Sequence, residues 1–501
     1  MLAVLLSVPF AVAISVLLFG LTPRAAAAIA LPGSLLTLVL AISVYLQYRG
    51  EPLGQSFDVS APWVDALHIN FRLGIDGMGV LFVLLTAILT PVAVLVAMYT
   101  VTERLQYYLT LLLFLEGALL GVFTALDLVL FYFFWEAVLI PAYFMIGTWG
   151  GERRVYAAFK YVLYTMAGSL LMLVGILLLY AQSTPHSFDL LTLIAHPLAP
   201  DVQKPVFLAF ALAFGIKAAL FPFHSWVPDV YTESNAPTAI ILSGVLSKMG
   251  IYGFLRIGLP LFPDAVRYFS PALMILSAIG IVYGALLCLY QRDGKRLVAC
   301  SSIAHLGFIM LGIFSLSSQG VQGATLQAVN HGVTIAALFA ILAVIAGRWG
   351  TTDLSKLSGL AKKAPVTAAI FLLATLSALG LPGLNGFAGE FLILVGSFKA
   401  NAADAVVGTI GVVLAAAYML RLFQGMMHGP QGSAASPPVA DVGAGTVPVA
   451  SGWRGEMSLT EYASIVPLLV LIVWIGVAPS GWLNPSLRFT QALIQSVGGI
   501  K

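Results

Sequence analysis

Long apolar runs recur along almost the whole chain, and they limit the folds available to it more than any other feature. A helix needs about 20 predominantly apolar residues to cross the hydrocarbon core of a bilayer. Of the 501 residues, 60% are hydrophobic and 9% are charged, whereas soluble domains carry roughly 25% charged residues. Counting runs of sufficient length predicts an all-α integral membrane protein with about fourteen transmembrane helices.

The expected spans divide the chain into four parts. The spans lie near residues 2–22, 27–47, 76–100, 107–125, 128–148, 156–181, 205–222, 237–260, 271–290, 296–317, 324–347, 366–395, 402–427 and 461–478. Residues 1–106 hold the first three helices and a polar loop, residues 107–260 and 271–427 hold five helices each, and residues 428–501 hold a connector and the last helix.

Three long polar segments separate the spans, at residues 48–75, 182–204 and 429–460. The last is rich in Gly, Ser, Ala, Pro and Val, a composition typical of a flexible connector. Basic residues favour the cytoplasmic side of a membrane protein. The odd-numbered loops hold 14 of them, against 8 in the even-numbered loops and the C-terminus. We therefore expect the odd loops to be cytoplasmic and both termini to lie on the opposite face.

Two of the expected spans contain residues that interrupt a helix. Residues 214–229, FGIKAALFPFHSWVPD, carry Pro222 and Pro228, and residues 376–391, LSALGLPGLNGFAGEF, carry Pro382 among several glycines. The interruptions fall in spans 7 and 12, at matching positions of spans 4–8 and 9–13. Because an odd number of helices reverses the orientation of a repeat, this pattern predicts two inverted five-helix repeats with broken helices 7 and 12.

Charged residues inside the expected spans are few, and they form the candidate site. They are Glu116, Glu136, Lys217, Lys248 and Glu390. Each charge costs at least about 2.5–3.5 kcal/mol at a helix centre, so these groups must be paired, hydrated or neutral. The further candidates are His305 and His331 in spans 10 and 11 and His224 after the first interruption, while Asp127 stands at a helix end.

Pairing would also let these groups move protons. Desolvation lowers the pKa of a buried lysine, and a nearby carboxylate raises it. A conformational step that moves Glu136 toward or away from Lys217 would therefore load and release a proton. Histidines, with a reference pKa near 6.5, suit the relay between such groups.

Structural roles are the alternative for the same residues. Glu136 could be an ion-pair partner, and Glu390 could stabilise the N-terminus of the second half of its broken helix. His305 and His331 could be packing residues with satisfied hydrogen bonds, and His224 could cap backbone groups at the interruption.

Other chemistries have no motif in this chain. Cys288 and Cys300 match no metal-binding spacing, which favours plain packing. Glycine-rich nucleotide loops, zinc motifs and cluster-binding cysteine sets do not occur in the sequence. We therefore expect no cofactor, no metal and no redox centre in this chain. A net charge of +3 and the lack of a basic tail argue against nucleic acid. The apolar N-terminus has no basic region before it and predicts a first membrane helix rather than a removed signal peptide.

Several segments resemble one protein family over residues 70–425. They are FYFFWEAVLIPAYFMIGTWGG, RRVYAAFKYVLYTMAGSLLML, KAALFPFHSWVPD, KRLVACSSIAHLGFIMLGIF, AVNHG and LSALGLPGLNGFAGEFLILVGSF. They are similar to the antiporter-like proton-pumping membrane subunits of respiratory complex I. The similarity is strongest to the subunit M, or chain 4, branch, whose members in cyanobacteria and plastids are the D-type proteins of the plastoquinone-reducing complex.

The resemblance implies a role for each matching charged residue. It makes Glu136 the family's fifth-helix glutamate, Lys217 its seventh-helix pumping lysine and Lys248 the eighth-helix lysine that links two half-channels. Glu390 would be the twelfth-helix acid near the proton outlet, and a glutamate here favours the subunit M branch.

The resemblance also implies the setting in which these residues work. His305 and His331 would lie on a central polar axis. The chain would be a translocase subunit of an NAD(P)H or ferredoxin:quinone oxidoreductase, beside neighbouring antiporter-like subunits and lipids. It would lie in the bacterial cytoplasmic membrane, or in the thylakoid membrane of a cyanobacterium.

Alternatives remain open. The family commonly reads WLPDAHxEAPT after the broken helix, whereas this chain reads WVPDVYTESNAPT. That departure could mark a variant D-type protein of a cyanobacterial carbon dioxide uptake complex. A subunit of a multi-subunit Na⁺(K⁺)/H⁺ antiporter or of a membrane-bound hydrogenase would share the broken helices. A purely structural membrane scaffold is the third class.

Overall fold

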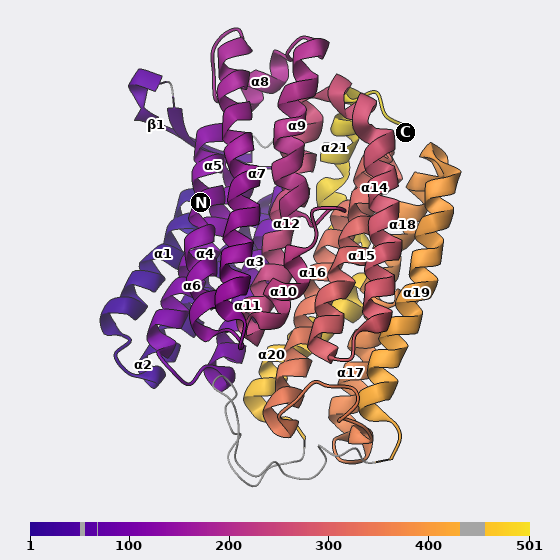
Figure 1. Ribbon diagram of the computed structural model, residues 1–501. Helices are drawn as coiled ribbons and strands as arrows, with labels where there is room; N and C mark the ends of the chain where they lie inside the picture. Colours follow the sequence, from indigo (N-terminus) through magenta and orange to yellow (C-terminus); the bar gives the residue numbers. More distant parts are fainter. Residues whose placement is uncertain (51–55, 68, 431–455, 501) are drawn as a thin grey trace.

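The computed structural model describes residues 1–50, 56–67, 69–430 and 456–500 and shows a bundle of long helices that run side by side (Figure 1). The helices are α1 (Leu2–Phe19), α2 (Pro23–Gln47), α3 (Gly77–Thr100), α4 (Leu105–Thr124), α5 (Leu128–Ala137), α6 (Leu139–Trp149), α7 (Arg154–Gln182), α8 (Leu190–Ala195), α9 (Pro200–Lys217), α10 (Trp226–Glu233), α11 (Ala236–Ile241), α12 (Ser247–Gly253), α13 (Leu259–Leu261), α14 (Pro263–Tyr290), α15 (Gly294–Phe314), α16 (Ser318–Trp349), α17 (Pro365–Ala378), α18 (Asn385–Ala400), α19 (Ala402–Met427), α20 (Leu459–Val477) and α21 (Ser480–Ser496).

Twelve helical stretches are long and apolar enough to cross a membrane in the described part of the chain. The expected count of about fourteen is therefore not confirmed. The two expected spans that do not qualify are 205–222 and 366–395, and both are the ones with an interruption. Their helices stop inside the bundle, because the backbone turns away before a full span is complete.

The interruptions in helices 7 and 12 are confirmed, and they share one backbone geometry. After α9, Ala219 has a φ of 54°, and the Leu220 amide donates to the Gly215 carbonyl at 2.8 Å. After α17, Gly380 has a φ of 77°, and the Leu381 amide donates to the Leu376 carbonyl at 3.0 Å. A residue in the left-handed region followed by this longer hydrogen bond is a common way to end a helix. The same ending at matching positions supports the expected repeat.

Further irregular segments interrupt spans that were expected to be continuous. The fifth span divides at Val138 between α5 and α6, and the eighth contains two π-helical segments, Leu242–Leu246 and Phe254–Gly258. Hydropathy carries no signal for either feature, because nearly all these residues are apolar or small. Single π-helical turns inside α-helices are frequent at functional sites.

One polar segment forms β-structure beside the otherwise helical fold. Within 48–75, β1 (Ser56–Val64) and β2 (Ile69–Ile75) form an antiparallel hairpin. Arg72 on β2 contacts Asp58 at 2.7 Å and Asp189 at 2.6 Å. The hydrogen bond to Asp58 is the main reason that the pKa of Arg72 is raised. The arginine thus fastens the hairpin to the loop before α8.

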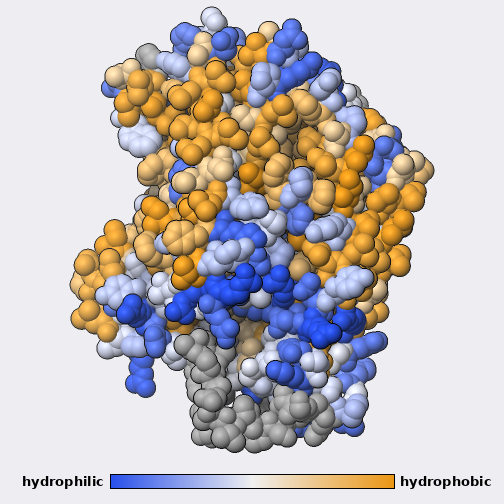
Figure 2. All heavy atoms as spheres, in the orientation of Figure 1, coloured by the Kyte–Doolittle hydropathy of each residue, from blue (hydrophilic) through white to orange (hydrophobic). Residues whose placement is uncertain are grey.

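The buried core of the bundle consists of helices that carry the candidate residues. The most apolar stretches of α11–α13 and of α15 are 100% buried and that of α16 is 94% buried, whereas those of α1 and α2 are 33% buried. Figure 2 shows hydrophobic side chains over most of one outer face, with hydrophilic side chains gathered at its upper rim and across its lower part. Lys248, His305 and His331 therefore lie inside a shell of apolar helices.

The ends of the chain lie on one side. Figure 1 marks both termini in its upper half, in agreement with the expectation that they share a face. The helix α21 was not expected, because its buried residues follow an amphipathic pattern rather than an apolar run. Most of the expected flexible connector, including Arg454, lies outside the described residues, as does Lys501.

A buried ion pair joins the start of α3 to the eighth span. Asp76 precedes α3 and accepts hydrogen bonds from the backbone amides of Met78 and Gly79, at 3.0 and 2.7 Å. Its other carboxylate oxygen lies 2.7 Å from Nε of Arg256, and both side chains are 1% exposed. Arg256 belongs to the π-helical segment 254–258. The pair therefore ties the irregular part of this span to a regular helix.

Removing one partner of this pair should destabilise the protein. We expect Arg256→Met to cost about 3–5 kcal/mol, because it leaves the Asp76 carboxylate buried and uncompensated. The double variant Asp76→Asn with Arg256→Met keeps the helix cap and removes both charges, so it should regain most of the loss. The thermal unfolding midpoint of the solubilised complex measures both effects. Equal midpoints for the single and double variants would contradict this assignment.

Candidate functional site

Lys217 is the last residue of α9, so it lies where the first half of the broken span ends. Its side chain is buried, and Nζ donates a hydrogen bond to the hydroxyl of Tyr161 at 3.2 Å. Nζ also lies 5.6 Å from the centre of the Trp135 ring. The C-terminal end of a helix carries partial negative charge on its unpaired carbonyls, which stabilises a cation there. The interruption thus offsets part of the cost of burying this ammonium group.

Glu136 lies beside this lysine without touching it. It is the penultimate residue of α5, just before the irregular residue Val138. Its Oε1 is buried and has no hydrogen-bond partner among the described residues. Trp135, whose ring centre lies 5.6 Å from Lys217 Nζ, directly precedes Glu136 in the chain, so the carboxylate stands next to a residue that contacts the lysine. The expected pairing is therefore a proximity of charges here, with Tyr161 as the direct partner of Lys217.

Lys248 lies in the short helix α12 between the two π-helical segments and is fully buried. Its Nζ donates to the carbonyl of Ser243 at 2.6 Å and to Nδ1 of His331 at 2.7 Å. A π-helical turn widens the helix and shifts its carbonyl pairing, and Ser243 belongs to such a turn. An ammonium group can only donate, so His331 accepts at Nδ1 and carries its proton on Nε2 when Lys248 is charged.

Two helices that carry lysines meet close to Lys248. A Cβ at Gly250, two residues after Lys248, would lie 2.3 Å from the carbonyl oxygen of Phe214 on α9. A side chain at this position would therefore push α12 away from the end of α9. The absence of a side chain at Gly250 lets the helix with Lys248 pack directly against the helix that ends at Lys217.

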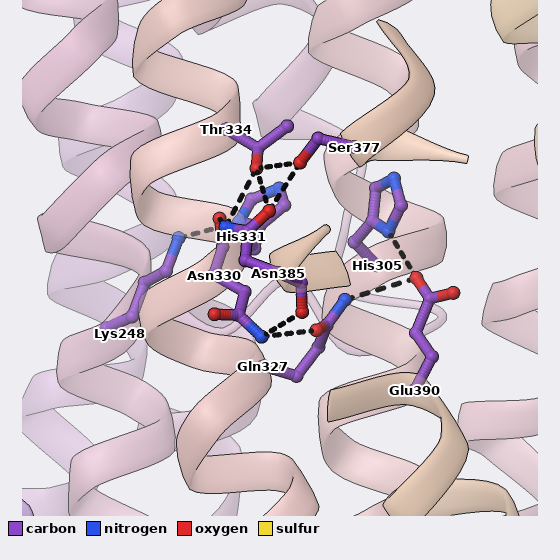
Figure 3. Close-up of polar contacts among 9 residues, drawn as sticks. All are labelled: Lys248, His305, Gln327, Asn330, His331, Thr334, Ser377, Asn385 and Glu390. Carbon is purple, nitrogen blue, oxygen red and sulfur yellow. Dashed lines mark hydrogen bonds and ion pairs between the residues drawn. The ribbon is translucent and has the colours of Figure 1, made fainter. Parts of the chain in front are cut away.

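The histidines extend the polar contacts from Lys248 toward Glu390 (Figure 3). His331 on α16 and His305 on α15 have ring centres 5.4 Å apart. His305 Nδ1 lies 3.4 Å from Oε1 of Glu390 on α18. All three side chains are buried. Helices α12, α15, α16 and α18 thus place four of the expected site residues in one buried row, which sequence order alone could not show.

A second set of polar side chains surrounds this row, and the sequence analysis missed it. Gln327, Asn330 and Thr334 project from one face of α16, and Ser377 and Asn385 flank the interruption between α17 and α18 (Figure 3). The signal was present, because residues at spacings of three and four lie on one face of a helix. Neutral amides were not counted among the costly groups, so the stripe went unnoticed.

The neutral set is linked by hydrogen bonds. Asn330 Nδ2 donates to the backbone carbonyl of Asn385 at 2.6 Å and to Gln327 Oε1 at 3.3 Å. Gln327 Nε2 donates to Glu390 Oε1 at 3.1 Å. The Asn385 side chain in turn donates to the Asn330 carbonyl and to Thr334 Oγ1, both at 3.2 Å. The interruption in helix 12 is therefore bonded to α16, and α16 is bonded to Glu390.

A small polar cavity lies between the histidines and the interruption, with a volume of about 10 Å³. It is lined by His305, Gln327, Asn330, His331, Thr334, Ser377, Ala378 and Gly386. Nε2 of His331 and Oδ1 of Asn330 are buried and have no hydrogen-bond partner among the described residues. A cavity of about 10–15 Å³ with several polar partners is near the size that one water molecule needs.

Two further expected site residues, like Glu136 and Lys217, lie outside the row. Glu116 on α4 is buried, and neither carboxylate oxygen has a hydrogen-bond partner in the described part of the chain. His224 stacks on Phe221 and meets Tyr283 edge-on, with ring centres 5.4 and 4.9 Å apart. The structure therefore places His224 in an aromatic contact and Glu116 in a buried position on α4.

The positions of the described His, Cys, Asp and Glu side chains do not favour metal binding. Within the described ranges, no three His, Cys, Asp or Glu side chains come close enough together to hold an ion. Cys288 and Cys300 are both buried as free thiols. Asp127 caps the N-terminus of α5 by accepting hydrogen bonds from the Val129 and Leu130 amides, at 2.8 and 3.2 Å. Its role at a helix end is structural.

Comparisons with known proteins show the family to which the chain belongs. Residues 125–415 match the family described as NADH:quinone oxidoreductase/Mrp antiporter, TM. NADH-quinone oxidoreductase subunit M of Rickettsia prowazekii is 38% identical over 460 residues, which cover 91% of this chain and 90% of the relative. A chain of respiratory complex I from Thermus thermophilus has a TM-score of 0.89 and 32% identity, with 100% of both chains covered.

The similarity reaches a second kind of complex, where it concerns the fold alone. A chain of the Mrp complex from Dietzia sp. DQ12-45-1b has a TM-score of 0.85 and 22% identity, over 99% of both chains. The relatives with higher identity carry the name subunit M. The chain belongs to the NADH:quinone oxidoreductase/Mrp antiporter family of multi-pass integral membrane proteins, in the branch of complex I subunit M, or chain 4.

Proposed function

We propose that this chain moves protons across the bacterial cytoplasmic membrane through the row formed by Lys248, His331, His305 and Glu390. The observation that carries this proposal is the series of buried contacts along that row: 2.7 Å from Lys248 to His331, 5.4 Å between the two histidine rings, and 3.4 Å from His305 to Glu390. Each member can hold or release a proton. The small cavity beside the histidines supplies room for a water to complete the path.

Glu136 and Lys217 control proton uptake in this proposal. Lys217 lies at the end of a half-helix, and Glu136 lies next to an irregular turn, so small movements at either interruption change the separation of the two charges. Because a carboxylate favours the charged form of a nearby lysine, such a movement changes the proton affinity of Lys217. Protons would be taken up from the cytoplasm near α9 and α11, pass Lys248 and His305, and leave near Glu390.

The driving reaction takes place elsewhere in the complex. The chain lies beside other membrane-arm subunits, as complex I and Mrp chains of this fold do, and it also contacts lipids. Electron transfer from the donor to quinone occurs in those other subunits, and this chain contributes no redox centre. Electron transfer acts on this chain through a conformational change that alters the Glu136–Lys217 distance.

Neutralising either residue of the Glu136–Lys217 pair should strongly reduce pumping without preventing assembly. We expect Glu136→Gln or Lys217→Ala to lower proton translocation per NADH oxidised by about tenfold or more, because each removes a group that changes its proton affinity. Proton uptake into vesicles that contain the assembled complex measures the effect. Lys204→Ala is the matched control and should pump normally, because this half-buried lysine lies near the other end of the same helix, against the Tyr268 ring.

Two outcomes would count against the role of this pair. Full pumping stoichiometry in a normally assembled Glu136→Gln or Lys217→Ala complex would refute it. Loss of assembly in both variants, with normal pumping by the residual complexes, would favour a purely structural scaffold.

Lys248 and His331 should behave as one unit. Because their nitrogens are 2.7 Å apart, either Lys248→Met or His331→Phe alone breaks the same transfer step. We expect the double variant to retain as much pumping as the more impaired of the two single variants. The reason is that the effects of residues that act together are not additive. Independent losses that multiply in the double variant would show that the two residues serve separate paths.

A further inference from the structure

Gln327 is the neutral residue with the closest link to the acid at the end of the row. Its Nε2 lies 3.1 Å from Glu390 Oε1, and its side chain is 2% exposed. The α18 backbone approaches closely at this point. A Cβ at Gly389 would lie 2.4 Å from Gln327 Oε1. The absence of a side chain at Gly389 therefore leaves the space in which the amide of Gln327 sits.

The orientation of the Gln327 amide follows from its neighbours. A backbone carbonyl can only accept a hydrogen bond, so the Asn330 atom at 2.6 Å from the Asn385 carbonyl must be the donor Nδ2. The same Nδ2 lies 3.3 Å from Gln327 Oε1. A flipped Gln327 amide would place two donors against each other. Gln327 must therefore present its oxygen to Asn330 and its N–H to Glu390.

The orientation of the Gln327 amide determines which oxygen of the Glu390 carboxyl group accepts a hydrogen bond. Since Gln327 offers a donor, Oε1 of Glu390 is held as an acceptor. The other oxygen, Oε2, faces the interruption, because a Cβ at Gly380 would lie 2.7 Å from it. The carbonyl oxygen of a protonated carboxyl group is the better acceptor, so acceptance at Oε1 favours the proton on the other oxygen. The proton of a neutral Glu390 therefore resides on the side of Gly380, the left-handed residue that follows α17.

We propose that Gln327 is a positioning residue for Glu390: its amide holds Oε1 beside His305 and ties the carboxyl group, through Asn330, to the interruption between α17 and α18. Ser377 and Thr334 complete that tie, with their hydroxyl oxygens 2.8 Å apart and both bonded to Asn385 Oδ1. A movement of the interruption thus reaches Glu390 through neutral groups that do not themselves exchange protons. This inference rests on the proposed role of Glu390 in proton transfer.

The test removes the Gln327 amide while keeping the length of the side chain. Gln327→Met keeps the side-chain reach but removes the donor and the acceptor. We expect proton translocation per NADH oxidised to fall about tenfold at neutral pH, and the pH midpoint of pumping to move by about one unit. The reason is that the ionised Glu390 carboxylate loses the hydrogen bond that the Gln327 amide donates to it. Thr325→Val is the matched control, because its buried hydroxyl on the same helix bonds the Val321 carbonyl of its own helix, at 3.0 Å.

A double variant separates positioning from general disruption. If Gln327 acts through Glu390, adding Gln327→Met to Glu390→Gln should cause no further loss. A helix that is merely disturbed would lose assembly without a shifted pH profile, and its effect would add to that of Glu390→Gln. Additive losses, or an unshifted pH midpoint in Gln327→Met, would overturn the positioning role. Normal pumping by Glu390→Gln alone would instead refute the proposed function, so the two failures are distinguishable.

Discussion

The cost of placing charged groups inside an apolar bundle is the constraint on which this structure depends. A lone charge at the centre of a membrane helix is strongly unfavourable, yet Lys217, Lys248 and Glu390 are all almost fully buried. Each is stabilised in a different way. Lys217 uses the end of a half-helix, Lys248 uses a carbonyl in a π-helical turn, and Glu390 uses a histidine and an amide. Irregular backbone is therefore found where the charges are.

Irregular backbone has a cost of its own in a membrane, because unpaired amides and carbonyls find no water there. The bundle meets this cost by keeping its interrupted helices within reach of buried polar groups. At the first interruption, Trp226 Nε1 donates to the Ile216 carbonyl at 2.9 Å. At the second, the side chain of Asn330 donates to the Asn385 carbonyl at 2.6 Å. The two endings share a backbone geometry but differ in what holds them. The indole of Trp226 holds the first ending, and the side-chain amides of Asn330 and Asn385 hold the second.

This difference fits the positions of the two interruptions on the proposed path. The first places a lysine beside a carboxylate that it does not touch, an arrangement that small movements can alter. The second is tied to α16 by neutral hydrogen bonds, which fix donor and acceptor directions without carrying charge. In such buried networks each member is costly to leave unpaired. In the proposed path, the separation of Lys217 and Glu136 at the uptake end can vary, whereas hydrogen bonds fix the orientation of Glu390 at the outlet end.

The sequence by itself determined the membrane class, the two broken helices, the family and the residues that carry charge, because apolar runs, prolines and charged residues in apolar runs have direct physical meaning. It could not show that Lys248, His331, His305 and Glu390 form one row, since those contacts join four helices far apart in the chain. Apolar runs also gave no sign of the hairpin, the π-helical turns or the amphipathic helix α21. Only the tertiary structure decided that Tyr161 is the direct partner of Lys217, and that the amide of Gln327 donates a hydrogen bond to Glu390. Those choices depend on how closely backbones approach, as at Gly250 and Gly389, and no local sequence pattern encodes that distance.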